Sequence, residues 1–162
     1  LGTLTLPQTD FVIPEAPSTA PALAFYGARM FEHGDIVAFE TSQNLPVTIV
    51  KIGSAYVKDY LHVEGKGGGS FIEYHDTPHF HMPLERSARG HLLLGRTDGD
   101  DYLLSAFRIP YGNAIYTPPN ALHADPYLVG RYLVVYAVTE NYSTVVFRSQ
   151  DGRPVNPRVG QA

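Results

Sequence analysis

The sequence predicts a single all-β domain, built as a sandwich or a barrel. Short runs of β-branched and aromatic residues recur along the chain, and glycine, proline and asparagine separate them. No stretch shows the long 3.6-residue periodicity of an amphipathic helix. The length of 162 residues suits one domain with one core.

Composition fits a folded globular protein and narrows its partners. Hydrophobic residues make up 44% of the chain and charged residues 17%. The net charge is −4 and there is no basic stripe, so nucleic acid is not an expected partner. No apolar run approaches the ~20 residues of a membrane helix, so no membrane partner is expected.

The absence of cysteine excludes several kinds of chemistry. Disulfides, thiolate metal ligands and a cysteine nucleophile all require a residue that this chain lacks. The compartment is not determined by this absence. We expect a cytoplasmic protein slightly more than an exported one, and the start at Leu1 leaves export open.

The chain divides into an arm, a barrel and a tail. Residues 1–22 are a proline-rich, extended arm, because proline blocks regular helix. Such an arm wraps the outside of a barrel, pairs with a partner chain, or stays a loose terminus. Residues 23–148 are predicted to form the barrel, and residues 149–162 an irregular tail with two glycines and two prolines.

The expected elements of the barrel follow from the same patterns. A helical turn is expected only within residues 22–31. Strands are expected at residues 35–40, 46–52, 55–63, 70–75, 91–95, 102–109, 114–117, 132–139 and 144–147.

Two histidines separated by one residue form the first chemical pattern. Residues i and i+2 of a strand point to the same face, so His79 and His81 can aim two imidazoles at one point. Pro83 bends the chain and could return Glu85 to that point. Imidazole and carboxylate ligands suit Zn, Fe, Mn or Ni. A pair of half-exposed surface histidines is the alternative explanation of this segment alone.

A second segment adds a third imidazole. Gly112 is followed by a short strand, then a tight turn that contains Pro118 and Asn120, and then His123. Asparagine is the residue that best replaces glycine where the backbone is left-handed.

Together the two segments resemble the paired motifs of the cupin superfamily of jelly-roll β-barrels. The first motif is glycine, His-x-His, glutamate and glycine, and the second is glycine, Pro-x-Gly and histidine. Carried over residue by residue, the resemblance implies one divalent metal ion, Fe, Mn, Zn or Ni, bound by His79, His81, Glu85 and His123.

The chain departs from the first motif at both glycines. Glu73 stands where the leading glycine is expected, and Leu92 where the closing glycine is expected, with Gly95 three residues later. Either three residues are inserted after Glu85, or Glu85 is not a metal ligand.

The resemblance also implies a function. A metal with an open coordination position would support isomerase, epimerase or lyase chemistry on a small oxygen-rich substrate, or dioxygenation with Fe(II). Glu85 is the candidate catalytic residue because it could move protons. A non-catalytic small-molecule-binding or sensing cupin, and a structural barrel without metal, remain alternatives. Cupins commonly dimerise, so a homodimer is expected.

Several further residues are candidate substrate contacts: His75, Tyr74, Tyr116, Phe107, Arg96 and Arg108. An even offset along a strand would put His75 on the side of His79, although Pro78 lies between them. The three aromatic side chains belong to predicted strands, where core packing is the alternative role. The two arginines could clamp a carboxylate or phosphate, or be solvated charges at the rim.

Overall fold

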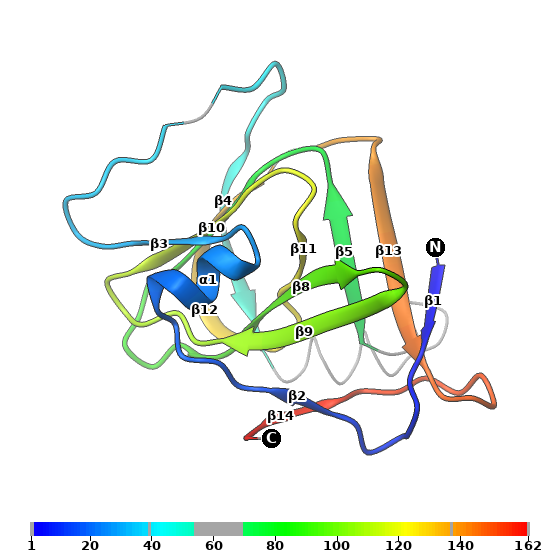
Figure 1. Cartoon of the computed structure of the whole chain (residues 1–162). Helices are drawn as coiled ribbons and strands as arrows, with labels where there is room; N and C mark the ends of the chain where they lie inside the picture. Colours follow the sequence, from blue (N-terminus) through cyan, green and yellow to red (C-terminus); the bar gives the residue numbers. More distant parts are fainter. Residues whose placement is uncertain (1, 39, 54–69, 137, 162) are drawn as a thin grey trace.

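The computed structural model describes residues 2–38, 40–53, 70–136 and 138–161. Across these residues the chain is built from strands and a single short helix (Figure 1). In order, the elements are β1 (Gly2–Thr5), β2 (Val12–Pro14), α1 (Ala20–Phe25), β3 (Arg29–Phe31), β4 (Val47–Ile52), β5 (Phe71–His75), β6 (His79–Pro83), β7 (Arg89–Gly90), β8 (Leu92–Asp98), β9 (Asp101–Phe107), β10 (Ala114–Thr117), β11 (Leu122–Ala124), β12 (Leu128–Val135), β13 (Tyr142–Arg148) and β14 (Arg158–Gly160).

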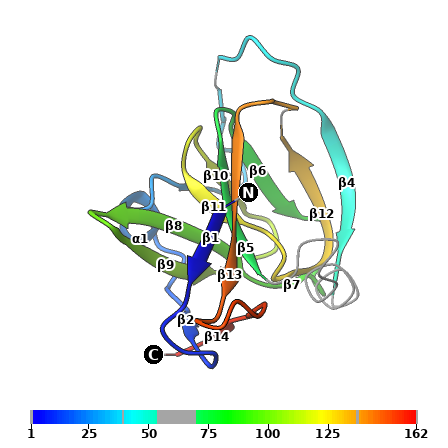
Figure 2. The same cartoon turned by 90° about the vertical axis from the view of Figure 1, so that its right-hand side faces the viewer.

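Two sheets face each other and curl into a barrel-like shape (Figure 2). The first sheet has the strand order β1-β13-β5-β11-β8-β9. The second has the order β3-β10-β6-β12-β4, and β7 also pairs with β12. From β4 to β6 and again from β9 to β13, consecutive strands alternate between the two sheets, which is compatible with a jelly roll. The predicted all-β fold is confirmed.

The interior between the sheets is apolar at one end. Leu92, Leu94 and Phe107 of the first sheet are completely buried there. They belong to the same core cluster as Ile115 and Tyr132 of the second sheet. Alternation along each strand produces this arrangement, because every second side chain points inward.

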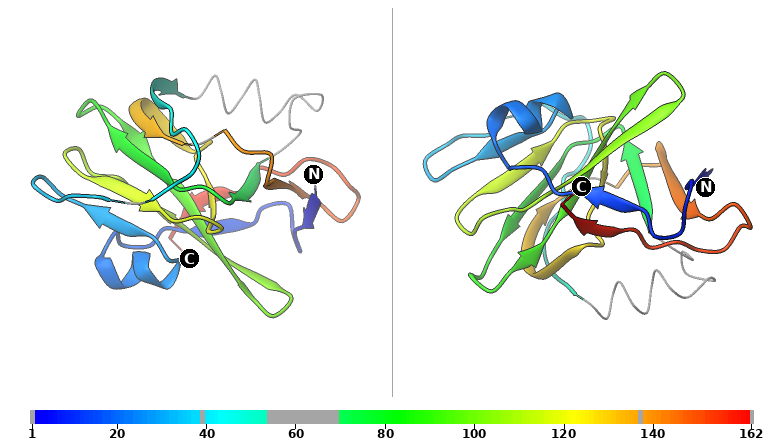
Figure 3. Two further views of the ribbon diagram at one scale, coloured as in Figure 1. Left: turned by 90° about the horizontal axis from the view of Figure 1, so that it is seen from above. Right: turned by 60° about the horizontal axis from the view of Figure 1, so that its bottom comes forward.

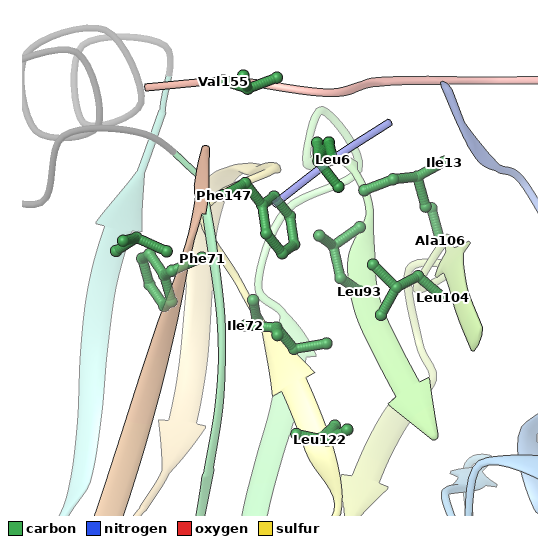
Figure 4. Close-up of a cluster of buried hydrophobic side chains, with 12 residues drawn as sticks. Leu6, Ile13, Phe71, Ile72, Leu93, Leu104, Ala106, Leu122, Phe147 and Val155 are labelled. Carbon is green, nitrogen blue, oxygen red and sulfur yellow. The ribbon is translucent and has the colours of Figure 1, made fainter. Parts of the chain in front are cut away.

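The outer face of the first sheet forms a second apolar cluster (Figure 4). Leu93, Ile72, Leu122 and Phe147 project from the sheet, and side chains from both ends of the chain cover them: Leu6, Ile13 and Val155. Gly95 sits within this face because a Cβ there would lie 2.7 Å from the side chain of Ile72.

The N-terminal arm therefore wraps the barrel of its own chain, which was one of the alternatives. Its first strand, β1, adds to the edge of the first sheet in parallel with β13. Its second strand, β2, pairs in parallel with β14 of the tail; the two lie side by side (Figure 3), below the sheets in the view of Figure 1. Glu15 fastens the end of the arm, with Oε1 2.7 Å from Arg108 Nε and 3.3 Å from His91 Nε2.

Local chemistry explains two departures from the expected elements. Helix α1 begins earlier than expected and is shorter, with Pro21 in its first turn, where a missing N–H costs nothing. The chain then turns at Gly27, with φ of 77°, and β3 takes the rest of the expected helical segment.

The prediction of a strand at residues 35–40 is wrong, because the described residues 35–38 and 40 form no strand. There the backbone N–H of Glu32 donates to Asp35 Oδ2, and that of Asp35 donates to the Glu32 carbonyl, which closes a turn. The strand expected at residues 55–63 lies outside the described residues.

No helix among the described residues has the length and apolar character needed to cross a membrane. The expected homodimer stays a prediction.

We expect Ile13→Ala to destabilise the protein by about 3 kcal/mol, because it opens a cavity between the arm and the first sheet. Ile13 is completely buried, whereas Ile36 is 85% exposed and gives a matched control. Ile36→Ala should change the free energy of unfolding by less than about 0.5 kcal/mol. Urea unfolding measures both. Equal midpoints for the two variants would mean that the arm does not contribute to the folded state.

Candidate metal centre

Three strands bring three histidines together between the sheets. His75 is the last residue of β5, His79 is the first residue of β6, and His123 is the middle residue of β11. In the antiparallel β5–β11 pair, His123 lies directly opposite Glu73. Opposite residues share a face, and so do residues i and i+2, so His123, Glu73 and His75 all point inward.

The three imidazoles form a compact cluster. One ring nitrogen from each of His75, His79 and His123 lies within 4.8 Å of the others. The ring centroids are 4.5 to 4.9 Å apart. His123 Nε2 lies 2.9 Å from His79 Nδ1. Two nitrogens bound about 2.1 Å from one ion, at right angles to each other, would be about 3 Å apart. The spacing therefore fits two ligands of one metal ion.

In two of the three histidines, the ring nitrogen Nδ1 has a partner that orients the ring for metal binding through Nε2. His123 Nδ1 lies 2.9 Å from the carbonyl oxygen of Ala121 and donates its proton there, so Nε2 carries the lone pair, which in this structure accepts a hydrogen bond from His79 Nδ1. His75 Nδ1 lies 2.9 Å from Thr77 Oγ1, and its buried Nε2 has no hydrogen-bond partner. Metal-binding histidines are commonly oriented by such contacts.

Burial keeps the cluster neutral. It lowers the pKa of His123 to about 4, and the neighbouring imidazoles add to the effect. Burial also lowers the pKa of His79, helped by His123 and His81, and burial lowers the pKa of His75. Imidazoles that are already deprotonated near neutral pH release no proton when a cation binds.

The turn before β11 has the predicted left-handed residue. Asn120 has φ of 63°, and among the described residues other than glycine it alone has a positive φ. Its backbone N–H donates to the carbonyl oxygen of His75 over 2.7 Å. The turn of the second motif is therefore tied directly to the end of β5, beside the cluster.

The structure places His81 next to the cluster rather than within it. His81 is completely buried, and its ring centroid lies 5.3 Å from that of His79. Its Nε2 lies 3.5 Å from Asp125 Oδ2, and neither ring nitrogen has a hydrogen-bond partner. His75 takes the third place that the motif assigned to His81.

Glu85 lies beyond the opposite end of β6 from His79. Its Oε1 accepts a hydrogen bond from the backbone N–H of Arg131 over 3.2 Å. A Cβ at Gly130 would lie 3.3 Å from the same oxygen. Glu85 is not part of the three-histidine cluster, and its predicted roles as ligand and catalytic residue find no geometric support.

Of the predicted substrate contacts, only His75 lines the cavity beside the cluster. The other five lie elsewhere. Tyr74 and Tyr116 lie on outer faces, since Tyr74 is 42% exposed and Tyr116 packs on Phe31, and Phe107 is completely buried against Tyr26. The two arginines act outside the barrel: Arg96 stacks over Phe25, and Arg108 binds Glu15.

A cavity of about 500 Å³ opens beside the cluster, between the two sheets. His75 and His79 line it on one side together with two carboxylates, Glu73 and Asp125. The rest of the described wall is formed by hydroxyl and aliphatic side chains: Thr48, Val50, Val134, Tyr136, Val138, Thr139 and Tyr142. The volume suits a small organic molecule.

The two carboxylates were not predicted from the sequence. Each stands two positions from a cluster histidine, Glu73 before His75 and Asp125 after His123, so the period-2 rule that paired His79 with His81 would have found them. Burial, and then the negative charge of Asp125, raise the pKa of Glu73 to about 7.

Comparison with known proteins gives no family for this chain. No protein-family model matches it, and no curated protein matches it.

We expect the metal-free protein to lose stability as the pH falls from 6.5 to about 4. The pKa of His123 drops from 6.5 to about 4 on folding, so the unfolded chain binds more protons in this range. The contribution of His123 is at most about 3 kcal/mol. His123→Asn should flatten this part of the pH dependence, measured by urea unfolding with a chelator present.

The matched control for this experiment is His33→Asn, because His33 is an exposed loop residue. The control should keep the full pH dependence. Equal slopes for wild type and His123→Asn would show that the ring is not buried as described.

Proposed function

We propose that this chain is a metal-dependent enzyme of the cupin type that acts on a small, oxygen-rich organic molecule. The observation that carries the proposal is the group of three imidazole nitrogens within 4.8 Å of one another beside a cavity of about 500 Å³. The resident ion would be Fe, Mn, Zn or Ni, because three neutral imidazoles suit all four.

The bound metal would supply Lewis acidity toward a substrate oxygen, and with Fe(II) also the capacity to react with O₂. Three protein nitrogens leave coordination positions open, which is typical of catalytic rather than structural sites. The cavity adjoins the side of the cluster formed by His75 and His79, so a substrate oxygen can reach the open side.

Residues of the cavity wall could hold the substrate and move its protons. Glu73 and Asp125 supply carboxyl groups in reach of a molecule in the cavity, and either can accept or return a proton at its carboxylate oxygen. Tyr136 and Tyr142 supply hydroxyl groups. Val134 belongs to the apolar part of the wall, which would exclude water from one side of the substrate.

The charges of the wall favour an uncharged substrate group next to the carboxylates. Neither lysine nor arginine occurs in the described lining of the cavity. An additional anionic group on the substrate would therefore face Glu73 and Asp125 without a cationic side chain to pair with.

We expect alanine substitution of His75, His79 or His123 to lower metal affinity at least about 10-fold, because each removes a ligand. Zn(II) and Mn(II) affinities can be measured by competition with a chromophoric chelator. His33→Ala is the matched control and should bind as wild type. Unchanged affinity in all three cluster variants would contradict the proposal.

Elemental analysis and metabolite screening then separate the reaction classes. Near-stoichiometric iron together with O₂ uptake would favour dioxygenation. Manganese, zinc or nickel with turnover but no O₂ uptake would favour isomerase or lyase chemistry. Tight ligand binding without turnover would point to the non-catalytic alternative.

We expect Glu73→Gln to strengthen binding of an anionic ligand relative to a neutral one, because it removes a negative charge from the wall. Xylonate and xylitol form a suitable pair, measured by calorimetry on the zinc-loaded protein well above pH 7, because burial raises the pKa of Glu73 to about 7 without metal and a bound cation would lower it. Glu140→Gln alters an exposed carboxylate and should leave the ratio unchanged. A Glu73→Gln ratio equal to that of wild type would contradict this charge preference.

A further inference from the structure

We propose that Asp125 is the carboxylate of the metal centre, in the part that the sequence motif gave to Glu85. The inference rests on the proposed function, since it assumes that the cluster of His75, His79 and His123 binds a metal ion. It concerns which acidic side chain of this chain completes the site and how that side chain is held.

The position of Asp125 follows from the strand that positions His123. Asp125 comes two residues later, directly after β11 ends, and so points to the same side of the chain. It lines the same cavity as His75 and His79, but its oxygens lie outside the group of atoms within 4.8 Å of one another, so binding the ion would require its side chain to move toward the cluster. Its side chain is 28% exposed, so it is not fully enclosed in protein.

His81 provides a second, independent observation. Its side chain is completely buried; Nδ1 has no hydrogen-bond partner, and Nε2 has only a long contact with Asp125. Buried polar groups without a partner are rare in folded proteins, so such a nitrogen points to an interaction that forms in the working state. The group facing His81 Nε2 is Asp125 Oδ2, at 3.5 Å.

In this proposal, His81 and Asp125 act as a pair. When one oxygen of Asp125 binds the ion, His81 Nε2–H can donate to the other oxygen and fix the carboxylate. Contacts of this kind orient carboxylate ligands in metal sites and contribute to affinity. His81 is then a positioning residue that acts through Asp125, rather than a ligand itself.

The other two acidic candidates are engaged elsewhere. The carboxylate of Glu85 accepts the backbone N–H of Arg131 beyond the far end of β6. Glu73 also lines the cavity, but its side chain hydrogen-bonds to Thr144 on the neighbouring strand β13. Asp125 alone of these three faces the unpartnered imidazole of His81.

A carboxylate ligand at this position would change which metal ions the site binds best. Three neutral imidazoles leave a divalent ion with its full charge, and one carboxylate reduces the net charge of the centre to +1. The oxygen donor also makes the site more suitable for Mn(II) and Fe(II) than imidazoles alone.

The test compares metal affinities and Co(II) absorption spectra of three variants. Asp125→Asn should lower the affinity for Zn(II) and Mn(II) at least about 10-fold and shift the visible Co(II) bands. Glu85→Gln should match wild type in both measurements. Asp151→Asn is the control for an exposed aspartate outside the barrel interior, paired with Arg153, and should also match wild type.

A second measurement does not depend on the folding of the Asp125 variant. Infrared difference spectra of wild type upon Zn(II) binding should show a shifted carboxylate band, and Glu85→Gln should retain it. Far-UV circular dichroism of metal-free Asp125→Asn checks its fold.

The outcomes separate this inference from the proposed function. Wild-type affinity and spectra in folded Asp125→Asn, or loss of the infrared band in Glu85→Gln, would overturn the role of Asp125 while leaving the histidine centre intact. A wild-type chain that binds none of these metals would overturn both.

Discussion

The candidate site depends on the pairing of β11 with β5. In that pair His123 lies opposite Glu73, and Glu73 shares its inward face with His75. A shift of one residue in this register would turn His123 to the outer face, because side chains alternate along a strand. The hydrogen bond from Asn120 N–H to the His75 carbonyl reinforces the register at the turn before β11. The cluster is therefore a consequence of backbone pairing.

The two faces of the first sheet have different roles: the outer face stabilises the fold, and the inner face carries the candidate site. Its outer face is apolar and is covered by the arm and the tail, with Ile13 completely buried there. Its inner face is apolar at one end, where Phe107 packs, and polar at the other, where the histidines and Glu73 lie. Burying neutral imidazoles and carboxyl groups costs free energy. The continuous apolar cluster on the outside helps to offset that cost, so the arm is part of what allows a polar cavity.

The ligand motif and the geometry agree on two of the three cluster histidines, His79 and His123. The motif and the structure differ on the third histidine and on the glutamate, and the course of the chain explains both differences. Pro78 and the turn before it end β5 at His75, so the chain re-enters at β6 with His75 and His79 on the same side. His81 then lies one step further along β6, and Glu85 lies past its end. The sequence offered the open question of an insertion after Glu85 or a different ligand, and the placement of Glu85 on Arg131 N–H favours the second.

By itself the sequence determined the all-β class, most of the longer strands of the barrel, the left-handed turn residue Asn120 and the neighbourhood of His79 and His123. These features depend on local rules, since alternation, turn preference and i,i+2 spacing act over a few residues. Only the tertiary structure decided that the arm docks, that His75 joins the cluster, and that Asp125 rather than Glu85 shares its cavity. Those outcomes depend on which strands pair and in which register, and pairing joins segments too far apart in the chain for local patterns to specify.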